Sequence, residues 1–594
     1  MRQSLTKLTV MLFLMLLSVN YTYSQYLEHP EHVKYTSPKD NSMYNMESTS
    51  IIIGFDSHQD PDDIRLRVTG SLSGSHIGKT KILSRNPLKI SFTPNKPFKL
   101  GEKVSVTGYD HYEKFVFYIR NKVVANVKNL TSERLNLETK SLKPIGNNYN
   151  TNNYLLDTIP ELVVHQYGQT APGNLFLINF NNLSSLASYL MILNNDGTPK
   201  YAQKLRFRGF DFKKQNNYYI YWDEDHYQYR ALDSSYAEVD SFYCGNGYVT
   251  DFHECILAPD NSAWVMSYDP QVVDMSLIYP GGQHIAQVTG LIIQKINAEK
   301  DVVFQWRSWD HMNILDATHE DFTANAIDYV HGNSIEVDTD GNIIISSRHL
   351  DEITKFDSET GEFIWRLGGK NNEFSFNNDP DKFSHQHSAR RLTNNNLMLF
   401  DNGNFHTPQY SRAVEYRMDV VDKKVDLIWE YRNSPEIYAF AMGNVQRLPN
   451  GNTLIGWGAS TTTLTEVGPD KTVRYTLAVP NGQWSYRAFR YNTVDVITNT
   501  NPSNNIVKEY MLSQNFPNPF NPITKINFAI PKSGMVSVKV YDMLGKEVTT
   551  LVNEVLNNGS YSVNFNASSL SSGIYFYKIS VNDFNDVKKM MLIK

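Results

Sequence analysis

Histidines with polar neighbours precede several strand-like runs in the middle of the chain. The segments are Asp251-Phe-His253-Glu254, Asp328-Tyr-Val-His331-Gly-Asn333-Ser334, Ser384-His385-Gln-His387-Ser-Ala389 and Met442-Gly-Asn444-Val445. A neutral imidazole can act as a nucleophile, exchange a proton or bind a metal. One histidine among 16 is more often structural, but recurrence at equivalent places of a repeat indicates a shared site. The pattern therefore predicts one site built from these segments.

A cation follows the second of these segments. Arg348 ends the run Ile345-Ser-Ser-Arg348, and its strand follows that of His331, so we expect it to reach the same site. The guanidinium is a permanent, planar cation that suits the oxygens of a tetrahedral oxyanion. The alternative is a surface arginine paired with Asp338 or Asp351.

The region 151–495, which carries these residues, has the pattern of a repeat. Each copy has a strand-like run, an Asp-Gly or Asn-Gly turn, a second strand and a segment ending in an aromatic residue, as at 334–365. Six copies can be counted, with unequal spacing and a long insertion before Asp328, which predicts a six-bladed β-propeller. The innermost strands of the blades line a central channel, so side chains at their starts converge on one axis.

Smaller β regions are expected on both sides of the propeller. Residues 25–150 show short apolar runs and period-two alternation broken by Gly, Pro and Asp, which predicts an N-terminal β-sandwich domain. A polar linker at 496–512 precedes further short strands at 513–594, which predict a small C-terminal Ig-like β-sandwich. The predicted fold class is therefore all-β.

Both ends of the sequence carry export features. Basic residues, an apolar stretch at 8–19 and the small residues of Thr22-Tyr-Ser24 predict a signal peptide over 1–24. The segments 515–522, Val538-Lys-Val-Tyr-Asp-Met-Leu-Gly-Lys546 and Ser572-Gly-Ile-Tyr575 resemble the C-terminal sorting domain of the type IX secretion system. That resemblance implies export through the periplasm by this machinery, then secretion or anchoring at the cell surface, away from intracellular nucleotides.

Net charge and hydropathy argue against two kinds of partner, nucleic acid and the membrane interior. A net charge of −6 without a long basic block argues against nucleic acid, and no segment after residue 24 is apolar enough to be an integral membrane span. Cys244 and Cys255 either form a disulfide, as neighbouring strands of a hairpin in an oxidising compartment would allow, or remain buried thiols.

A set of motifs across roughly residues 45–490 resembles the bacterial arylsulfotransferases. They are Asp251-Phe-His253-Glu254, His331-Gly-Asn333-Ser334, Ser346-Ser-Arg348, Trp365-Arg-Leu-Gly-Gly369, Gln386-His387-Ser-Ala389 and Phe400-Asp-Asn-Gly403. The resemblance implies a β-sandwich followed by a six-bladed propeller. It also implies transfer of a sulfuryl group from an aryl sulfate donor to a phenolic acceptor through a sulfated histidine, without a nucleotide sulfate donor.

The resemblance also assigns roles by position. It makes His387 the nucleophile, His331 and Arg348 the holders of the sulfuryl oxygens, Asn333 a nearby donor and His253 the histidine at the aryl oxygen. Substrate contacts are further expected from His385 and Asn444, and no metal or cofactor is expected. Because the strand reads His-Gln-His, the sequence leaves open whether His387 or His385 is sulfated.

Two other functions fit parts of the pattern. A metal-dependent propeller hydrolase would use His385 and His387, which face the same way on a strand, although few carboxylates lie beside them in sequence. A secreted propeller that binds a glycan or a protein is the other alternative, but it has no need for several convergent histidines and an arginine.

Overall fold

The computed structural model describes residues 33–56, 64–85, 87–108, 115–124, 159–180, 187–480, 482–492, 510–515, 518–556, 559–567 and 570–593. The predicted signal peptide and most of the predicted linker lie outside these residues. The regular structure of the described chain is almost entirely β, as predicted, with 53% of the residues in strands and 3% in helices. The helices in the described residues are η2 (Met275–Leu277), α3 (Ser308–His311), η3 (Ile314–Asp316) and η4 (Arg348–Leu350). Length and hydropathy exclude a membrane span for every helix in the described residues.

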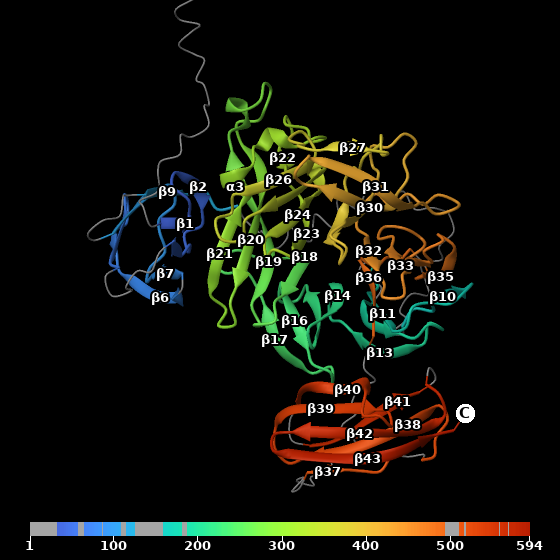
Figure 1. Ribbon diagram of the computed structural model, residues 1–594. Coiled ribbons are helices and arrows are strands. Elements are labelled where there is room, and N and C mark those ends of the chain that lie inside the picture. Colours follow the sequence, from blue (N-terminus) through green and yellow to red (C-terminus); the bar gives the residue numbers. More distant parts are fainter. Residues whose placement is uncertain are drawn as a thin grey trace, which may run out of the picture. The chain divides into compact units, whose positions relative to one another are not determined.

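Within the described residues 159–492, the strands form six sheets, coloured teal to orange in Figure 1. Four sheets consist mainly of consecutive antiparallel strands. The first of these contains β14 (Gly209–Gln215), β15 (Tyr218–Asp223), β16 (Gln228–Leu232) and β17 (Glu238–Phe242). The next contains β18 (Thr250–Leu257), β19 (Ala263–Val273), β20 (Ala286–Ile296) and β21 (Val302–Arg307), with β22 (Ala326–Asp328) parallel to β20.

The other two follow the same plan. One contains β23 (Gly332–Val337), β24 (Ile343–Ser347), β25 (Glu352–Phe356) and β26 (Phe363–Gly368). The second contains β28 (His387–Arg391), β29 (Leu397–Asp401), β30 (Arg412–Asp419) and β31 (Lys424–Tyr431), with β27 (Ser375–Asn377) parallel to β31.

The remaining two sheets each combine strands from the two ends of this region. In one, the inner strand β36 (Ala488–Tyr491) pairs with β11 (Asn174–Ile178), followed by β12 (Tyr189–Leu193) and β13 (Pro199–Lys204). In the other, β32 (Asn444–Arg447), β33 (Thr453–Gly456), β34 (Leu464–Val467) and β35 (Val473–Ala478) end at the outer strand β10 (Val163–Gln166).

The inner strands β36, β14, β18, β23, β28 and β32 contact one another in a closed ring. The six-bladed propeller is therefore confirmed. Two of its sheets combine strands from both ends of the region, which the repeat did not predict. Its core lies between neighbouring blades. For example, Phe400 and Trp457 pack edge to face with 5.8 Å between ring centroids.

The N-terminal unit is a β-sandwich, as predicted. Its described residues form one sheet of β1 (Val33–Ser37), β3 (Ile51–Phe55), β7 (Leu88–Pro94) and β6 (Gly78–Arg85). They form a second sheet of β2 (Ser42–Asn45), β9 (Phe115–Ile119), β8 (Lys103–Gly108), β4 (Leu66–Gly70) and β5 (Gly74–His76). Ile51, Val104 and Phe117 belong to the apolar core that the two sheets share.

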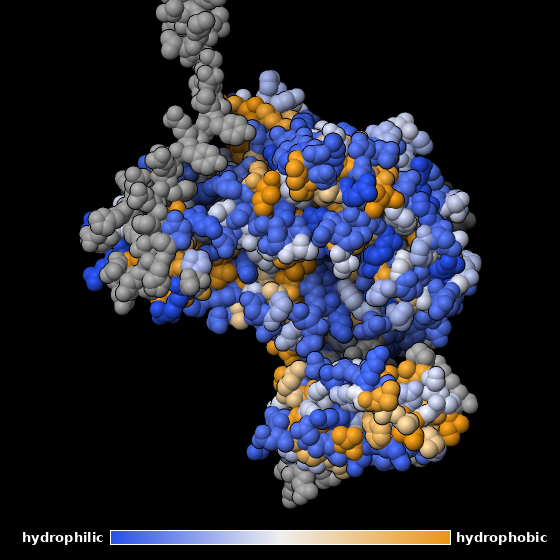
Figure 2. Space-filling view, viewed as in Figure 1, coloured by the Kyte–Doolittle hydropathy of each residue, from blue (hydrophilic) through white to orange (hydrophobic). Residues whose placement is uncertain are grey.

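The C-terminal region is a second sandwich, again as predicted. Its described strands are β37 (Met511–Leu512), β38 (Ile523–Ile530) and β41 (Gly559–Asn566) in one sheet, and β40 (Glu547–Leu556), β39 (Gly534–Tyr541), β42 (Gly573–Val581) and β43 (Phe584–Leu592) in the other. Val538, Phe565 and Tyr577 belong to its buried core. On the visible surface, hydrophilic residues cover most of the propeller, whereas hydrophilic and apolar residues are mixed on this sandwich (Figure 2).

Cys244 and Cys255 are both free thiols in the structure. Both are buried, and burial raises the pKa of each thiol well above its ordinary value. Of the two alternatives that the sequence left open, the structure has the buried thiols.

Candidate active site

Three neighbouring inner strands bring the predicted histidines to one end of the channel. His253 lies in β18, His331 immediately precedes β23, and His387 is the first residue of β28. β23 contacts both β18 and β28, so the three segments are adjacent. All three imidazoles are buried.

The same backbone turn is used in three successive blades. His331, His385 and Met442 have left-handed backbone with φ of +50°, +52° and +66°. This conformation costs a residue with a Cβ atom about 1–2 kcal/mol. In each of these blades the left-handed residue lies two positions before a second shared position of the repeat, which is occupied by Asn333, His387 and Asn444, respectively. Retained strain of this kind is typical of functional sites.

His253 is held by a carboxylate and by other rings. Its Nδ1 pairs with Asp251, whose Oδ1 also accepts from the His253 backbone N–H. Because a carboxylate faces Nδ1, we assign the ring proton to that nitrogen. The ring centroid lies 5.4 Å from that of His331 and 5.6 Å from that of Tyr486.

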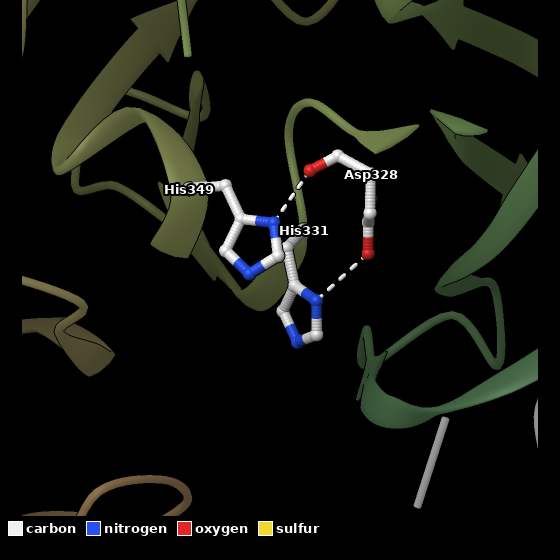
Figure 3. A group of neighbouring side chains, drawn as sticks. All are labelled: Asp328, His331 and His349. Atoms are coloured by element: carbon white, nitrogen blue, oxygen red, sulfur yellow. Dashed lines mark hydrogen bonds and ion pairs between the residues drawn. The ribbon is translucent and has the colours of Figure 1, made fainter. Parts of the chain in front are cut away.

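His331 and His349 share Asp328, as Figure 3 shows. His331 Nδ1 lies 2.9 Å from Asp328 Oδ2, and His349 Nδ1 bonds the Asp328 backbone carbonyl. The two ring centroids are 4.6 Å apart. Burial, together with the charges of His331 and Arg348, lowers the pKa of His349 to about 3, so this ring is neutral at physiological pH.

Arg348 begins the short helix η4 and is buried beside these rings. Its Nη1 donates to His349 Nε2 at 2.7 Å, and its Nη2 donates to the Phe440 carbonyl at 3.3 Å. Among the described residues Arg348 forms no ion pair with Asp338 or Asp351. The arginine is therefore a buried cation that forms no direct ion pair with a carboxylate of the described residues.

His387 is fixed in one orientation through Nδ1. This nitrogen lies 2.7 Å from Asn402 Oδ1 and 3.1 Å from the His385 carbonyl oxygen. Both partners are acceptors, so Nδ1 carries the proton and Nε2 carries the free lone pair. Burial and the nearby charges of Arg348, His331 and His253 hold the pKa of His387 well below its ordinary value. The ring is neutral, and Nε2 presents a lone pair without prior deprotonation, which is the state that a nucleophilic imidazole needs.

His385 lies in the same site but is held differently. Neither ring nitrogen has a hydrogen-bond partner among the described residues. Its ring lies 5.5 Å from His349 and 4.9 Å from Phe405, which in turn stacks on His319 at 3.3 Å. Burial, followed by Arg348 and the neighbouring histidines, lowers the pKa of His385 far below its ordinary value. It is therefore a second neutral imidazole with no defined tautomer.

The two predicted asparagines bind strands to one another. Asn333 donates from Nδ2 to the Gln386 carbonyl at 2.7 Å and so connects β23 to the segment before β28. Asn444 uses both ends of its amide on the backbone of Ala488, at 2.8 and 3.0 Å. Both donor and acceptor of Asn444 are thus engaged with β36, so the geometry gives it a structural position. Asn333 retains a buried Oδ1 with no partner among the described residues.

Glu320 enters the site from the insertion before β22. Its Oε1 lies 3.3 Å from His349 Nδ1. Burial and the neighbouring Asp328 raise the pKa of Glu320 to about 7, against the opposing charges of His331 and Arg348. It is therefore a group that changes charge close to neutral pH beside Arg348.

The aromatic residues of the insertion mostly serve packing. Trp306 is buried and donates to the Gly361 carbonyl at 3.2 Å, and Trp309 donates to Asp269 at 3.0 Å. Tyr279 and Phe322 pack on each other with 5.2 Å between centroids. An aromatic wall nearer the histidines comes instead from Phe405.

Ion pairs between charges that are buried or nearly buried connect the inner strands across the centre of the propeller. Arg487 pairs with Asp211 at 2.9 Å and with Glu254 at 3.0 Å, and Glu254 also pairs with Lys213 and Arg390. Burial opposes ionisation of Glu254, but Arg390, Arg487 and Lys213 outweigh it and hold its pKa below the ordinary value. Arg487 Nη2 also donates to the Asn333 carbonyl at 2.7 Å, which joins this network to the site.

Asp328, His331 and His349 offer ligand atoms within 4.8 Å of one another, a spacing that suits a metal ion. However, His349 already accepts a hydrogen bond from the guanidinium of Arg348, so a fixed positive charge borders the group. Because of this fixed positive charge, the group is better suited to bind an anion than a metal cation.

Sequence reasoning had not singled out His349, Glu320 or Asn402. His349 adjoins Arg348, and Asn402 lies in the quoted motif Phe400-Asp-Asn-Gly403, so adjacency offered a weak signal for both. Glu320 belongs to an insertion without repeat partners, and no sequence pattern could identify it.

Comparisons with known proteins agree with the fold and the motifs. Residues 220–478 match the family described as arylsulfotransferase (ASST), and residues 514–594 match the secretion system C-terminal sorting domain. None of the curated proteins matches the chain.

Several solved structures are similar at low identity. A protein of unknown function from Bacteroides caccae is 11% identical with a TM-score of 0.35, over 53% of this chain and 98% of that one. Virginiamycin B lyase from Staphylococcus aureus is 8% identical with a TM-score of 0.30, over 53% and 88%. Apo AztD from Citrobacter koseri is 10% identical with a TM-score of 0.26, over 54% and 90%. At these values no functional conclusion follows.

The sorting domain indicates export by the type IX secretion system, followed by surface attachment or release. Taken with the match across the propeller, this places the protein by its domains. The propeller segment 220–478 matches the arylsulfotransferase family model, and residues 514–594 match the sorting domain of the type IX secretion system.

Proposed function

We propose that the propeller transfers a sulfuryl group from an aryl sulfate to a phenol in two steps, through an adduct on His387. The observation that carries this proposal is the state of His387: a neutral ring with its proton fixed on Nδ1, beside the buried cation of Arg348. Such a ring presents a nucleophilic lone pair to a negatively charged group that the arginine attracts.

In the first step, the sulfuryl oxygens of the donor lie against Arg348 and His331. Nε2 of His387 attacks sulfur, the N–S bond forms, and the bond from sulfur to the aryl oxygen breaks. Negative charge moves onto the aryl oxygen, and His253 in its imidazolium form, with Nδ1–H held by Asp251, donates its Nε2 proton there. An aryloxide is a moderate leaving group because a phenol has a pKa of about 10, so one well-placed acid suffices.

In the second step, a phenol takes the place of the first product. His253, now neutral, accepts the phenol proton, and the phenol oxygen attacks sulfur as the N–S bond breaks. The sum is an aryl sulfate and a phenol exchanging one sulfuryl group for one proton, so no further reactant is needed for balance.

The neighbouring residues have supporting roles in this proposal. Asn333 ties β23 to the segment that presents His387, which keeps His331 and His387 at a fixed separation. His385, with no defined tautomer, is a less suitable nucleophile and would lie against the substrate together with Phe405. Export by the sorting domain fits a reaction that uses no intracellular nucleotide.

The test is a screen of purified full-length protein with 4-nitrophenyl sulfate and a series of phenols, followed by release of nitrophenol and by detection of the sulfated acceptor. We expect turnover that requires both donor and acceptor. Absence of turnover across a broad range of donors and acceptors would contradict the proposal, and hydrolysis without transfer would replace it with a sulfatase.

A further inference from the structure

Asn402 holds the imidazole of His387 with an amide whose orientation is fixed on its far side. Its Nδ2 donates to the Ala439 carbonyl at 2.8 Å and to the Met442 carbonyl at 3.0 Å. An amide oxygen in that place would face two carbonyl oxygens, so Oδ1 must point at His387 Nδ1, 2.7 Å away. Asn402 is completely buried.

The loop that carries Asn402 is rigid for reasons of packing. Ser411 Oγ donates to the Asn402 carbonyl at 2.8 Å. Gly403 follows with φ of +66°, and a Cβ there would lie 1.9 Å from the Tyr410 carbonyl oxygen. The amide therefore cannot turn away without rebuilding the loop.

The histidines of this site differ in the group that faces Nδ1. His253 and His331 each face a carboxylate, of Asp251 and Asp328. His387 faces a neutral amide and a backbone carbonyl instead. A carboxylate stabilises a positive ring and can remove its proton, whereas an amide oxygen only accepts a hydrogen bond.

This difference matters most once Nε2 carries a sulfuryl group. The ring then keeps its proton on Nδ1 and is positively charged, so breaking the N–S bond releases a neutral imidazole. If a carboxylate removed that proton, the leaving group would be an imidazolate, which is a much stronger base and departs more slowly.

We infer that Asn402 is a positioning residue that keeps the proton on His387 in both steps, so that the sulfated ring remains reactive toward the acceptor. This inference rests on the proposed function. It predicts that the amide governs the lifetime of the adduct more than the rate at which the adduct forms.

The decisive variant is Asn402→Asp. Its second carboxylate oxygen would face the carbonyls of Ala439 and Met442, where a protonated acid can donate as the amide does. At low pH the variant should therefore resemble the wild type. As the pH rises and this carboxyl ionises, the adduct should outlive the wild-type adduct by about tenfold or more, which corresponds to a barrier about 1.4 kcal/mol higher.

The experiment loads each protein with 4-nitrophenyl sulfate, removes the donor, adds phenol and follows the adduct on the His387 peptide by quenched mass spectrometry at several pH values. An adduct lifetime that matches the wild type at every pH would overturn the inference. A wild-type protein that forms no adduct with any aryl sulfate would overturn the proposed function as well, so the two failures are distinguishable.

Asn402→Leu supplies a second test that requires no turnover. It has a similar size but no acceptor, so the Nδ1 proton of His387 keeps only the longer contact of 3.1 Å to the His385 carbonyl, and part of the population should move its proton to Nε2. In protein labelled with ¹⁵N-histidine, with His387→Gln to assign the signal, the wild type should show a single Nδ1–H tautomer. The same tautomer in Asn402→Leu would contradict the role given to Asn402.

Discussion

Nη1 of Arg348 donates a hydrogen bond to Nε2 of His349 over 2.7 Å, although the two side chains are consecutive in the sequence. His349 can accept this bond because its Nδ1 proton is directed at the Asp328 carbonyl and its pKa is lowered to about 3. The arginine is thereby oriented by a neutral partner that does not offset its positive charge.

Arg348→Lys should lower kcat/KM for sulfuryl transfer by about 10²–10³, the usual cost of removing one donor to a developing oxyanion. A lysine keeps the charge but cannot bond His349 and the substrate in a fixed plane. Steady-state kinetics with 4-nitrophenyl sulfate measures this. Arg417→Lys, at an exposed pair with Asp426, is the matched control and should change nothing. Unaltered kinetics in Arg348→Lys would remove the arginine from the reaction.

His387→Ala should abolish the sulfate adduct, because only this histidine has its tautomer fixed by Asn402 and the His385 carbonyl. His385→Ala should keep the adduct while weakening substrate binding. Mass spectrometry of the peptide that contains both residues, after incubation with donor alone, distinguishes the two. An adduct that survives in His387→Ala and disappears in His385→Ala would exchange their roles.

Binding of the donor should weaken as the pH rises through about 7. Burial raises the pKa of Glu320 to about 7, and above that value its negative charge offsets Arg348 and repels a sulfate ester. His331, His349 and Asp328 face the same group, and His349 stays neutral throughout this range. The KM of the donor is the measurement, and Glu320→Gln should remove its rise.

Glu336 provides the control for this prediction. Burial also raises the pKa of Glu336 to about 7, but the positive charge that opposes this shift is Arg390, which pairs with Glu254. Glu336→Gln should leave the pH dependence of KM unchanged. The raised pKa also affects folding stability. A carboxyl group with a raised pKa favours the folded state below about pH 4.5, and this contribution to stability is lost as the pH rises through 7. Denaturation of Glu320→Gln should therefore be less sensitive to pH in this window.

Glu254→Gln should destabilise the propeller by about 3–5 kcal/mol, the cost of breaking a buried ion pair from one side. Glu254 faces Lys213, Arg390 and Arg487, so its loss leaves buried cations with too little opposing charge. Urea denaturation followed by tryptophan fluorescence reports the change. Glu373→Gln, at an exposed pair with Lys423, should cost less than about 1 kcal/mol. Equal stability of both variants would show that the network is not needed for folding.

Removing residues 513–594 should prevent release from the cell and leave transferase activity intact. The sorting domain has its own core, in which Phe565 and Tyr577 are buried, and the site residues all belong to the propeller. Activity assays of periplasmic and external fractions provide the measurement. Normal export of the shortened protein would contradict the sorting role.

The repeat made it predictable that the candidate site residues lie close together. His253 and His387 share one position of the repeat with Asn333, and His331 lies two residues earlier, at the left-handed turn that His385 also occupies. A propeller brings both positions to the same end of its inner strands. The position of Arg348 could be predicted for the same reason, since this residue follows the strand after that of His331. The all-β fold and the blade count followed from strand and turn spacing.

The partners that set the chemical state of these residues were not predictable. Asn402 reaches His387 across a strand pair, and Glu320 arrives from an insertion that has no counterpart in other blades. Asn444 lies at the expected position of the repeat, but both ends of its amide form hydrogen bonds with the backbone of Ala488. Such pairings depend on three-dimensional distances that spacing along the chain does not encode.

The strand β36 is the last strand of the propeller, and Arg487 directly before it is tied to Asp211, Glu254 and the carbonyl of Asn333. A chain that stopped before residue 487 would therefore contain the histidines but lack both the closing strand and the cation that binds Asp211, Glu254 and Asn333. The candidate site is complete only when the last strand of the propeller has joined the ring.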